Sequence, residues 1–290
     1  MTVVVGVDHS PGSTRALEFA VIEARLRDVD LRIVHATEAW SPSPYSGHPK
    51  PSSYAERADE GRKLLARCRE RAHEALSPGR VHTQVQEGSA AKILIEESRD
   101  ATMVVVGSRE HGELRAVFLG SVGAAVAAHA HGPVVVVRGE PRDPDSEPGG
   151  EHRIVCGTDG SAHSDASIRF AFEEAALRRR HLDVVHVWRA YDFLTPRELE
   201  QLSRDADEPL RRDVGDKAAA WPSVRYRTVV VPGRPSAELV RRTAEAELMV
   251  VGHRGSGAPL AEMLLGSVSQ NVLHHAGCPV AVVREQRGRH

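Results

Sequence analysis

The sequence predicts an α/β protein with two doubly wound domains, each built on a five-stranded parallel sheet. The chain has 290 residues, of which 41% are hydrophobic, so it can form two ordinary domains with their own cores. Its second half repeats its first. Short runs rich in Val and Ile alternate with segments of helical period, as in parallel strands joined by helices.

The repeat defines the domain boundaries. VVVGVDHSPGSTRALEFA (3–20) returns as IVCGTDGSAHSDASIRFA (154–171), an offset of 151. LGSVGAAVAAHAHGPVVVV (119–137) returns as LGSVSQNVLHHAGCPVAVV (265–283), an offset of 146. The stretch GEPRDPDSEPGGEH between the copies is rich in proline, glycine and acidic residues, which indicates a linker. We therefore expect domains over 1–138 and 153–285, joined by the linker 139–152.

The elements of the first copy follow in chain order. The pattern predicts strands near 3–7, 30–36, 81–87, 103–107 and 133–138, and helices near 13–28, 53–76, 89–99 and 121–131. Runs such as Val134 to Val137 are apolar at every position, whereas a strand with one wet face would alternate. Helices should therefore cover both faces of each sheet.

Composition excludes several classes of protein. Lys and Arg number 38 against 40 Asp and Glu, a formal net charge of −2, so no overall field would attract nucleic acid or an anionic membrane. No apolar run approaches the roughly 20 residues of a membrane span. The three cysteines, Cys68, Cys156 and Cys278, form no CxxC spacing. These features favour a cytoplasmic protein without a disulfide framework or zinc site.

In each sheet, one aspartate and one glycine should meet at the same edge. Asp8 and Asp159 follow the first strands, and Gly107 and Gly252 follow the fourth strands. Doubly wound sheets bind ligands at this edge, where the strand order reverses. Each of these residues alone is equally consistent with a tight turn or a helix cap, but the combination indicates a ligand site.

The glycine stretches that follow the fourth strands are suited to a phosphate chain. They offer a backbone free to come close and exposed N–H groups. Each also leads into a helix N-terminus, at Gly120-Ser121 and Gly266-Ser267. The ends of the second strands, His35-Ala36 and His186-Val187, could flank a purine. The sequence contains no GxxxxGK[ST] motif and no GxGxxG after a first strand, so it lacks the two common phosphate-binding motifs of nucleotide-binding proteins.

Both copies resemble universal stress protein domains. Nucleotide-binding members of that family carry an aspartate after strand one and a G-x2-G-x9-G-[ST] loop after strand four. The resemblance covers the chain outside the linker. It implies a Rossmann-like fold with strand order 3-2-1-4-5, ATP binding with or without Mg²⁺, and pairing of the fifth strands into an intramolecular pseudo-dimer. The resemblance does not imply any particular catalytic activity.

The resemblance also implies which residues contact the nucleotide. By motif they are Asp8, Gly107, Gly120 and Ser121 in the first copy, and Asp159, Gly252, Gly255, Gly266 and Ser267 in the second. We expect neighbouring residues to take part as well, namely Gly6, Ala36, Arg109, Val122, Gly157, Val187, Arg254, Val268 and Ser269. We assign no catalytic residue and no metal ligand.

Each loop departs from the family pattern in its own way. The first copy has Glu110 in place of the second glycine, and the second copy has ten residues, 256–265, where the pattern has nine. A carboxylate about 4 Å from a phosphate charge costs about 4 kcal/mol at an effective dielectric near 20. An extra loop residue costs little. We therefore expect the second copy to hold the stronger site.

Three classes of function remain at this point. The first is an ATP-binding stress-response module that signals through nucleotide occupancy, which we favour. The second is a slow ATP hydrolase or adenylating enzyme, for which Asp8 and Asp159 are the only repeated carboxylate candidates. The third is a protein-interaction scaffold with vestigial loops, for which Glu110 and the longer second loop are the best evidence. Association of two chains into a homodimer is left open.

Overall fold

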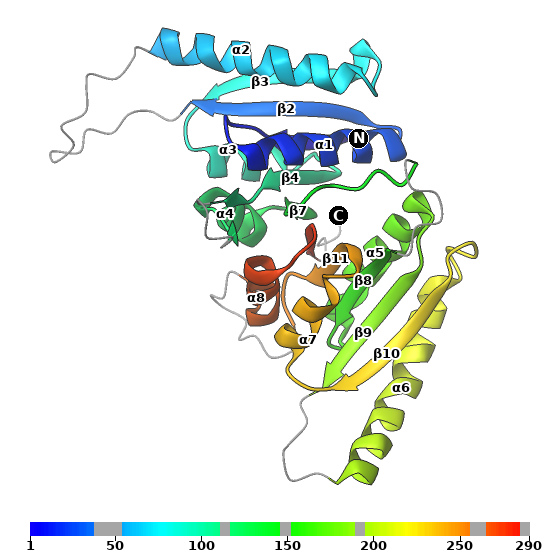
Figure 1. The fold of residues 1–290 in the computed structure, drawn as a ribbon. Coiled ribbons are helices and arrows are strands. Elements are labelled where there is room, and N and C mark those ends of the chain that lie inside the picture. The colour runs from blue at the N-terminus through cyan, green and yellow to red at the C-terminus, as the bar shows by residue number, and fades with distance from the viewer. Residues whose placement is uncertain (38–53, 111–116, 146–151, 189–194, 256–264, 285–290) are drawn as a thin grey trace, which may run out of the picture.

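The computed structural model describes residues 1–37, 54–110, 117–145, 152–188, 195–255 and 265–284. These residues form one ten-stranded sheet that runs from β3 at one end of the molecule to β10 at the other (Figure 1). None of the helices in these segments is long and apolar enough to cross a membrane.

The first half contains the elements expected from its sequence. In chain order they are β1 (Thr2–Gly6), α1 (Pro11–Leu26), β2 (Asp30–Thr37), α2 (Tyr54–His73), β3 (Val81–Glu87), α3 (Ala90–Glu97), β4 (Met103–Gly107), α4 (Ser121–His129) and β7 (Val134–Val137). Two features were not predicted, a 3₁₀ turn (Pro78–Arg80) and a short antiparallel hairpin of β5 (Arg109–Glu110) and β6 (Val117–Phe118).

The second half repeats this order. Its elements are β8 (Arg153–Thr158), α5 (Asp165–Arg178), β9 (Leu182–Trp188), α6 (Pro196–Ala218), β10 (Tyr226–Pro232), α7 (Pro235–Arg242), β11 (Ala246–Gly252), α8 (Ser267–His275) and β12 (Val280–Val283). A 3₁₀ turn (Ala162–Ser164) precedes α5, whereas α1 begins directly at its N-cap Ser10.

The strand order confirms the predicted fold class. The sheet reads β10-β9-β8-β11-β12-β7-β4-β1-β2-β3, so each half has the order 3-2-1-4-5. Strands within each half are parallel, and the two fifth strands, β7 and β12, pair antiparallel with Val136 opposite Val280. The pairing of the two copies through their fifth strands is therefore confirmed.

Helices cover both faces of the sheet. Side chains of α1, α2, α5 and α6 pack on one face, and side chains of α3, α4, α7 and α8 pack on the other. The central strands between them are buried, as Val134 to Val137 illustrate with at most 1% exposure, whereas the edge strands β3 and β10 are mostly exposed or half-buried. This arrangement explains why strands such as β7 are apolar at every position.

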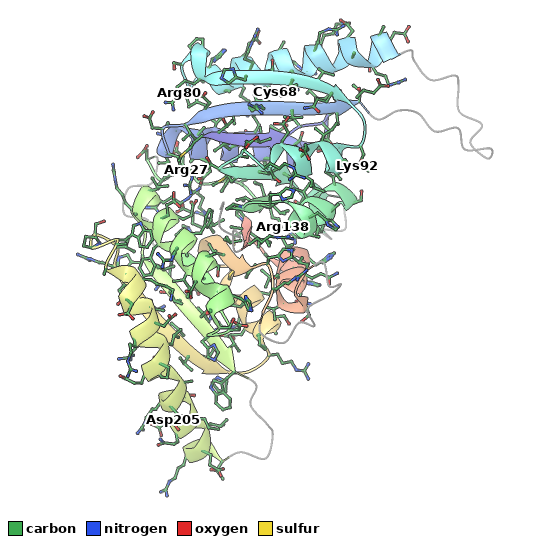
Figure 2. The ribbon with its side chains drawn as sticks, turned by 180° about the vertical axis from the view of Figure 1, so that it is seen from behind. Arg27, Cys68, Arg80, Lys92, Arg138 and Asp205 are labelled. Atoms are coloured by element: carbon green, nitrogen blue, oxygen red, sulfur yellow. The ribbon has the colours of Figure 1, made fainter. Side chains whose placement is uncertain are left out.

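A buried charge cluster joins α1 to α5 where the two halves meet, near Arg27 in Figure 2. We call it the seam cluster; it contains Glu23, Arg27, Glu174, Arg178 and Glu247. Arg178 donates to all three carboxylates, with Nε 2.9 Å from Glu174 and Nη1 2.8 Å from Glu247. Arg27 donates to Glu23 over 3.0 Å and to Glu174.

The seam cluster follows the internal repeat. Arg27 and Arg178 are 151 residues apart, as are Phe19 and Phe170. The Arg178 guanidinium lies 5.0 Å from the centre of the Phe19 ring, and the Arg27 guanidinium lies 5.6 Å from the centre of the Phe170 ring. Each half thus places its arginine on the other half's aromatic ring, a self-complementary contact of the kind found in two-fold dimers.

Candidate nucleotide site

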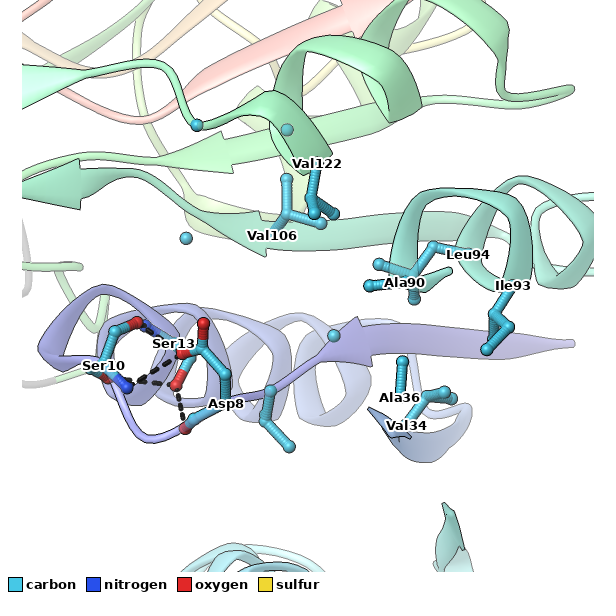
Figure 3. A pocket seen from close by; sticks show the side chains of 15 residues that line it. Asp8, Ser10, Ser13, Val34, Ala36, Ala90, Ile93, Leu94, Val106 and Val122 are labelled. Atoms are coloured by element: carbon cyan, nitrogen blue, oxygen red, sulfur yellow. Dashed lines mark hydrogen bonds between the residues drawn. The ribbon is translucent and has the colours of Figure 1, made fainter. Parts of the chain in front are cut away.

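The first half has a pocket at the edge of the sheet where the strand order reverses. It has a volume of about 90 Å³. Figure 3 shows polar side chains of Asp8, Ser10 and Ser13 at one end, and apolar side chains of Ala36, Ile93 and Leu94 at the other. The remaining lining residues are Gly6, Val7, Val34, Ala90, Val106, Gly107, Gly120, Val122 and Gly123. The predicted residues Gly6, Asp8, Ala36, Gly107, Gly120 and Val122 thus surround one cavity.

The polar end is organised by hydrogen bonds around Asp8. One carboxylate oxygen of Asp8 accepts from the Ser10 N–H over 2.8 Å and from the Ser10 hydroxyl. The Ser13 hydroxyl donates to the Asp8 carbonyl over 2.6 Å. Ser10 also caps α1 by accepting from the Ser13 N–H over 3.2 Å. The serines therefore hold the exposed Asp8 side chain at the mouth of the pocket.

A helix N-terminus completes this end of the pocket. Gly120 is the N-cap of α4, with φ −62° and ψ 155°, and it has no side chain to cap the first N–H groups. Gly266 caps α8 in the same conformation, with φ −65° and ψ 146°. The N–H groups of Ser121 and Val122, or of Ser267 and Val268, can therefore serve an anion, which the helix dipole also favours.

The apolar end has a backbone edge as well as side chains. The Val34 carbonyl of β2 accepts from the Val7 N–H over 2.9 Å, so the backbone of Val34 points toward the first strand. Backbone groups two residues apart on a strand point to the same side. The N–H and C=O of Ala36 therefore point past Gly6, where β1 ends. An adjacent donor and acceptor of this kind match the amine edge of adenine.

The second half brings its aspartate to the glycine loop. One oxygen of Asp159 accepts from the Ser161 N–H over 3.0 Å and from the hydroxyls of Ser161 and Ser164 over 2.6 and 2.8 Å. A Cβ on Gly255 would lie only 2.9 Å from the other oxygen of Asp159. Gly255 therefore lets the carboxylate and the loop lie side by side, a long-range contact between residues that the sequence analysis selected separately.

Three of the predicted glycines also have a packing reason. A Cβ on Gly107 would lie 2.2 Å from the Gly12 carbonyl oxygen, so α1 packs directly against the end of β4. A Cβ on Gly6 would lie 2.6 Å from Leu94, and a Cβ on Gly157 would lie 2.6 Å from Leu239. The approach at Gly107 is to backbone and requires glycine whether or not a ligand binds, whereas those at Gly6 and Gly157 are to leucine methyl groups, which would have to shift. Gly12 was missed, because only its contact with β4 identifies it.

The other predicted residues lie around the loops. The Ser269 hydroxyl donates to the Gly252 carbonyl over 2.6 Å and ties α8 to the end of β11. Arg254 is exposed beside it. Val187 has the same position on β9 as Ala36 has on β2. The side chains of Arg109 and Glu110, and all of 111–116 and 256–264, lie outside the described residues.

Comparison with known proteins identifies the family. The model of the Universal stress protein family matches residues 1–138 and 151–284. Universal stress protein Rv2623 of Mycobacterium tuberculosis is 33% identical over 298 residues, which cover 98% of this chain and 96% of that protein. A universal stress protein from Archaeoglobus fulgidus has a TM-score of 0.71 and 19% identity, and the match covers 99% of this chain and 98% of that one. A universal stress protein solved in complex with cAMP is 28% identical, with a TM-score of 0.37, and the match covers 47% of this chain and 98% of that one. This chain belongs to the universal stress protein family and carries two of its domains in tandem.

Proposed function

We propose that this protein binds ATP, with or without Mg²⁺, and acts as a nucleotide-dependent stress-response or signalling module. The observation that carries the proposal is the pocket of the first half. It joins an apolar wall at Ala36, Ile93 and Leu94 to the Asp8 carboxylate and the N-terminus of α4. An adenine nucleotide has the same order of groups along its length as the pocket requires: a flat base, a ribose with hydroxyl donors and an anionic phosphate chain.

Each part of ATP then has a partner in the pocket. The base would lie on the apolar wall with its amine edge at the Ala36 backbone, and the ribose hydroxyls would donate to Asp8. The phosphates would accept from the N–H groups of Ser121 and Val122. A Mg²⁺ ion accompanying the phosphates would meet Asp8, because Mg²⁺ in nucleotide sites takes carboxylate and phosphate oxygens. Asp159, Ser267 and Val268 would have the same functions in the second half.

Signalling is favoured over hydrolysis by the state of the site serines. The hydroxyls of Ser10, Ser161 and Ser164 donate to the carboxylates of Asp8 and Asp159, and Ser13 donates to a carbonyl. These bonds engage one oxygen of each carboxylate and hold both aspartates in place as ribose ligands, which is the role that we assign to them in a signalling module. We place the protein in the cytoplasm, where Cys68, Cys156 and Cys278, all free thiols here, would stay reduced.

Incubation of the purified chain with radiolabelled ATP and Mg²⁺ tests the proposal. After removal of free nucleotide, the bound fraction is separated by thin-layer chromatography. A signalling module retains intact ATP. Retained ADP would favour the slow hydrolase, and absence of bound nucleotide would favour the interaction scaffold.

A further inference from the structure

The two halves place their third helices, α3 and α7, in the same way beside the base-binding wall. Each helix follows a left-handed glycine, Gly88 with φ 135° or Gly233 with φ 154°. The Ile93 N–H donates to the Ser89 carbonyl over 3.0 Å, and the Glu238 N–H donates to the Arg234 carbonyl over the same distance.

The next residue of each helix confirms the equivalence. Leu94 packs 2.6 Å from the Cβ position of Gly6, and Leu239 packs 2.6 Å from the Cβ position of Gly157. Ile93 and Glu238, which directly precede these leucines, therefore occupy equivalent places.

Two residues of the apolar wall and one pocket-lining glycine of the first half are replaced by larger or charged residues in the second, while Leu94 has the equivalent Leu239. Ile93 lines the pocket, and its counterpart is Glu238. The counterpart of Ala36 is the bulkier Val187, and the counterpart of Gly123 is Ser269, whose hydroxyl is bonded to the Gly252 carbonyl. All three changes reduce the apolar space open to a base.

The charge at Glu238 is held in place by two arginines. Its carboxylate lies 2.8 Å from Arg241 and 2.8 Å from Arg242. The hydrogen bond from Arg241 lowers the pKa of Glu238, with further attraction from Arg242, so the side chain is ionised at neutral pH. A base placed against this wall would face a hydrated ion pair, from which it gains little by burial.

The phosphate-binding end shows no such loss in the second half. Asp159 meets Gly255 there, and Gly266 caps α8 as Gly120 caps α4. The first half, in contrast, has Glu110 of β5 at the place of the second glycine of the loop pattern. The wall residues therefore favour the first site for the base, and the loop sequences favour the second site for the phosphates.

We propose that Ile93 and Glu238 are specificity-determining residues that make the two sites bind different parts of the nucleotide. The first site selects adenine by apolar enclosure. The second site binds the phosphate chain and is tolerant of the base. This inference rests on the proposed function, since both sites must bind nucleotide.

Three probes separate these contributions: adenosine, inorganic tripolyphosphate and ATP. Gly120→Val with Ser121→Ala disables the phosphate end of the first site, and Gly266→Val with Ser267→Ala disables that of the second, so calorimetry with tripolyphosphate and ATP reports on one phosphate end at a time. Adenosine has no phosphate and is titrated into the unmodified chain, where the exchanged variants below assign its heat to a site. We expect adenosine to bind the first site at least tenfold more tightly than the second, an effect of about one buried apolar side chain. We expect tripolyphosphate to show the reverse order.

The exchanged variants isolate the two residues. Ile93→Glu should weaken adenosine binding at the first site about tenfold and leave tripolyphosphate binding unchanged. Glu238→Ile should strengthen adenosine binding at the second site. Equal adenosine affinity at both sites, or exchanged variants that do not change it, would overturn the inference while ATP binding stands. If ATP binds at neither site, the proposed function itself is overturned, and the inference with it.

Discussion

The two halves differ far more at the ligand edge than in the sheet and its helices. Gly6 and Gly157 each admit a leucine at 2.6 Å, and Arg27 and Arg178 each cover the other half's phenylalanine. At the ligand edge, in contrast, the isoleucine of the first half is replaced by a glutamate at the equivalent position of the second. Packing positions constrain both copies alike, whereas positions facing solvent and ligand are free to diverge. Two similar folds can therefore hold two dissimilar sites.

Removal of one arginine from the seam cluster should have the largest effect. The Arg178 side chain is 1% exposed and holds three carboxylates, whereas one of the partners of Arg27, Glu173, is 46% exposed. Arg178→Met should lower the free energy of unfolding by about 3–5 kcal/mol, because it removes one of the two arginines that neutralise each of three buried carboxylates. Arg27→Met should cost less. Urea denaturation measures both, and equal losses would show that the halves contribute equally to the seam.

The pH dependence of stability should distinguish the two buried glutamates of the seam. Burial and the charge of Glu174 raise the pKa of Glu23 above its ordinary 4.5. Burial also acts to raise the pKa of Glu174, but attraction by Arg27 and Arg178 outweighs it and lowers that pKa. The contribution of Glu23 to the free energy of unfolding is thus fully present below pH 4.5, and it is lost as the pH rises through the raised pKa of Glu23. Stability due to Glu174 is full above pH 4.5 and is lost as the pH falls through its lowered value.

Glutamine variants test this assignment. Glu174→Gln should destabilise the protein at pH 7 by about 1.5–3 kcal/mol, the contribution of hydrogen bonds to charged groups. Glu23→Gln should cost less at the same pH, because Glu23 gains less from its charge. Urea denaturation between pH 4 and pH 8 gives both values. A larger loss for Glu23→Gln at pH 7 would reverse the assignment.

Disabling the phosphate end of the second site should affect binding without unfolding the chain. A Cβ on Gly266 would make ordinary contacts, with the His253 carbonyl oxygen nearest at 3.4 Å. The added valine branches in Gly266→Val would obstruct the phosphates, and Ser267→Ala removes a donor. We expect affinity for ATP at this site to fall about a hundredfold, the effect of one or two charge-assisted hydrogen bonds. Calorimetry gives the affinity and circular dichroism checks the fold. A folded double variant with unchanged ATP binding would show that the loop is not the site.

The smallest expected effect concerns Glu110. Glu110→Gly should raise the affinity of the first site for ATP about tenfold, the effect of removing a like charge that water and salt screen to less than its value at about 4 Å, and it restores the family pattern. Glu110→Gln keeps the bulk and removes only the charge. Recovery in both variants assigns the effect to electrostatics, and recovery with glycine alone assigns it to the backbone. Calorimetry showing no change in either variant would place Glu110 away from the ligand.

The fold was predictable because its signals are local and repeated. Apolar runs such as Val134 to Val137 and the repeat between Asp8 and Asp159 can be read directly from the chain. The seam cluster could not be predicted, since Glu23 and Arg178 are 155 residues apart and meet only after the fifth strands pair. The same holds for Gly12, whose importance depends on its contact with Gly107 across the fold.

The candidate site was predicted in part, for the same reason. Motif residues such as Asp8 and Gly120 could be selected by spacing, and they do line one pocket. The base wall has no motif, because Ile93 is an ordinary apolar residue of an amphipathic helix until the structure places it beside Ala36. Glu238 likewise reads as a surface charge with helical partners.

Titration of the unmodified chain with ATP and Mg²⁺ by calorimetry tests the central claim most directly. The account predicts ATP binding at sub-millimolar affinity and, in parallel titrations, adenosine binding that Ile93→Glu weakens while tripolyphosphate binding stays unchanged. Heat that remains absent up to millimolar ATP would contradict nucleotide binding. Adenosine binding that Ile93→Glu leaves unchanged would contradict the difference between the halves.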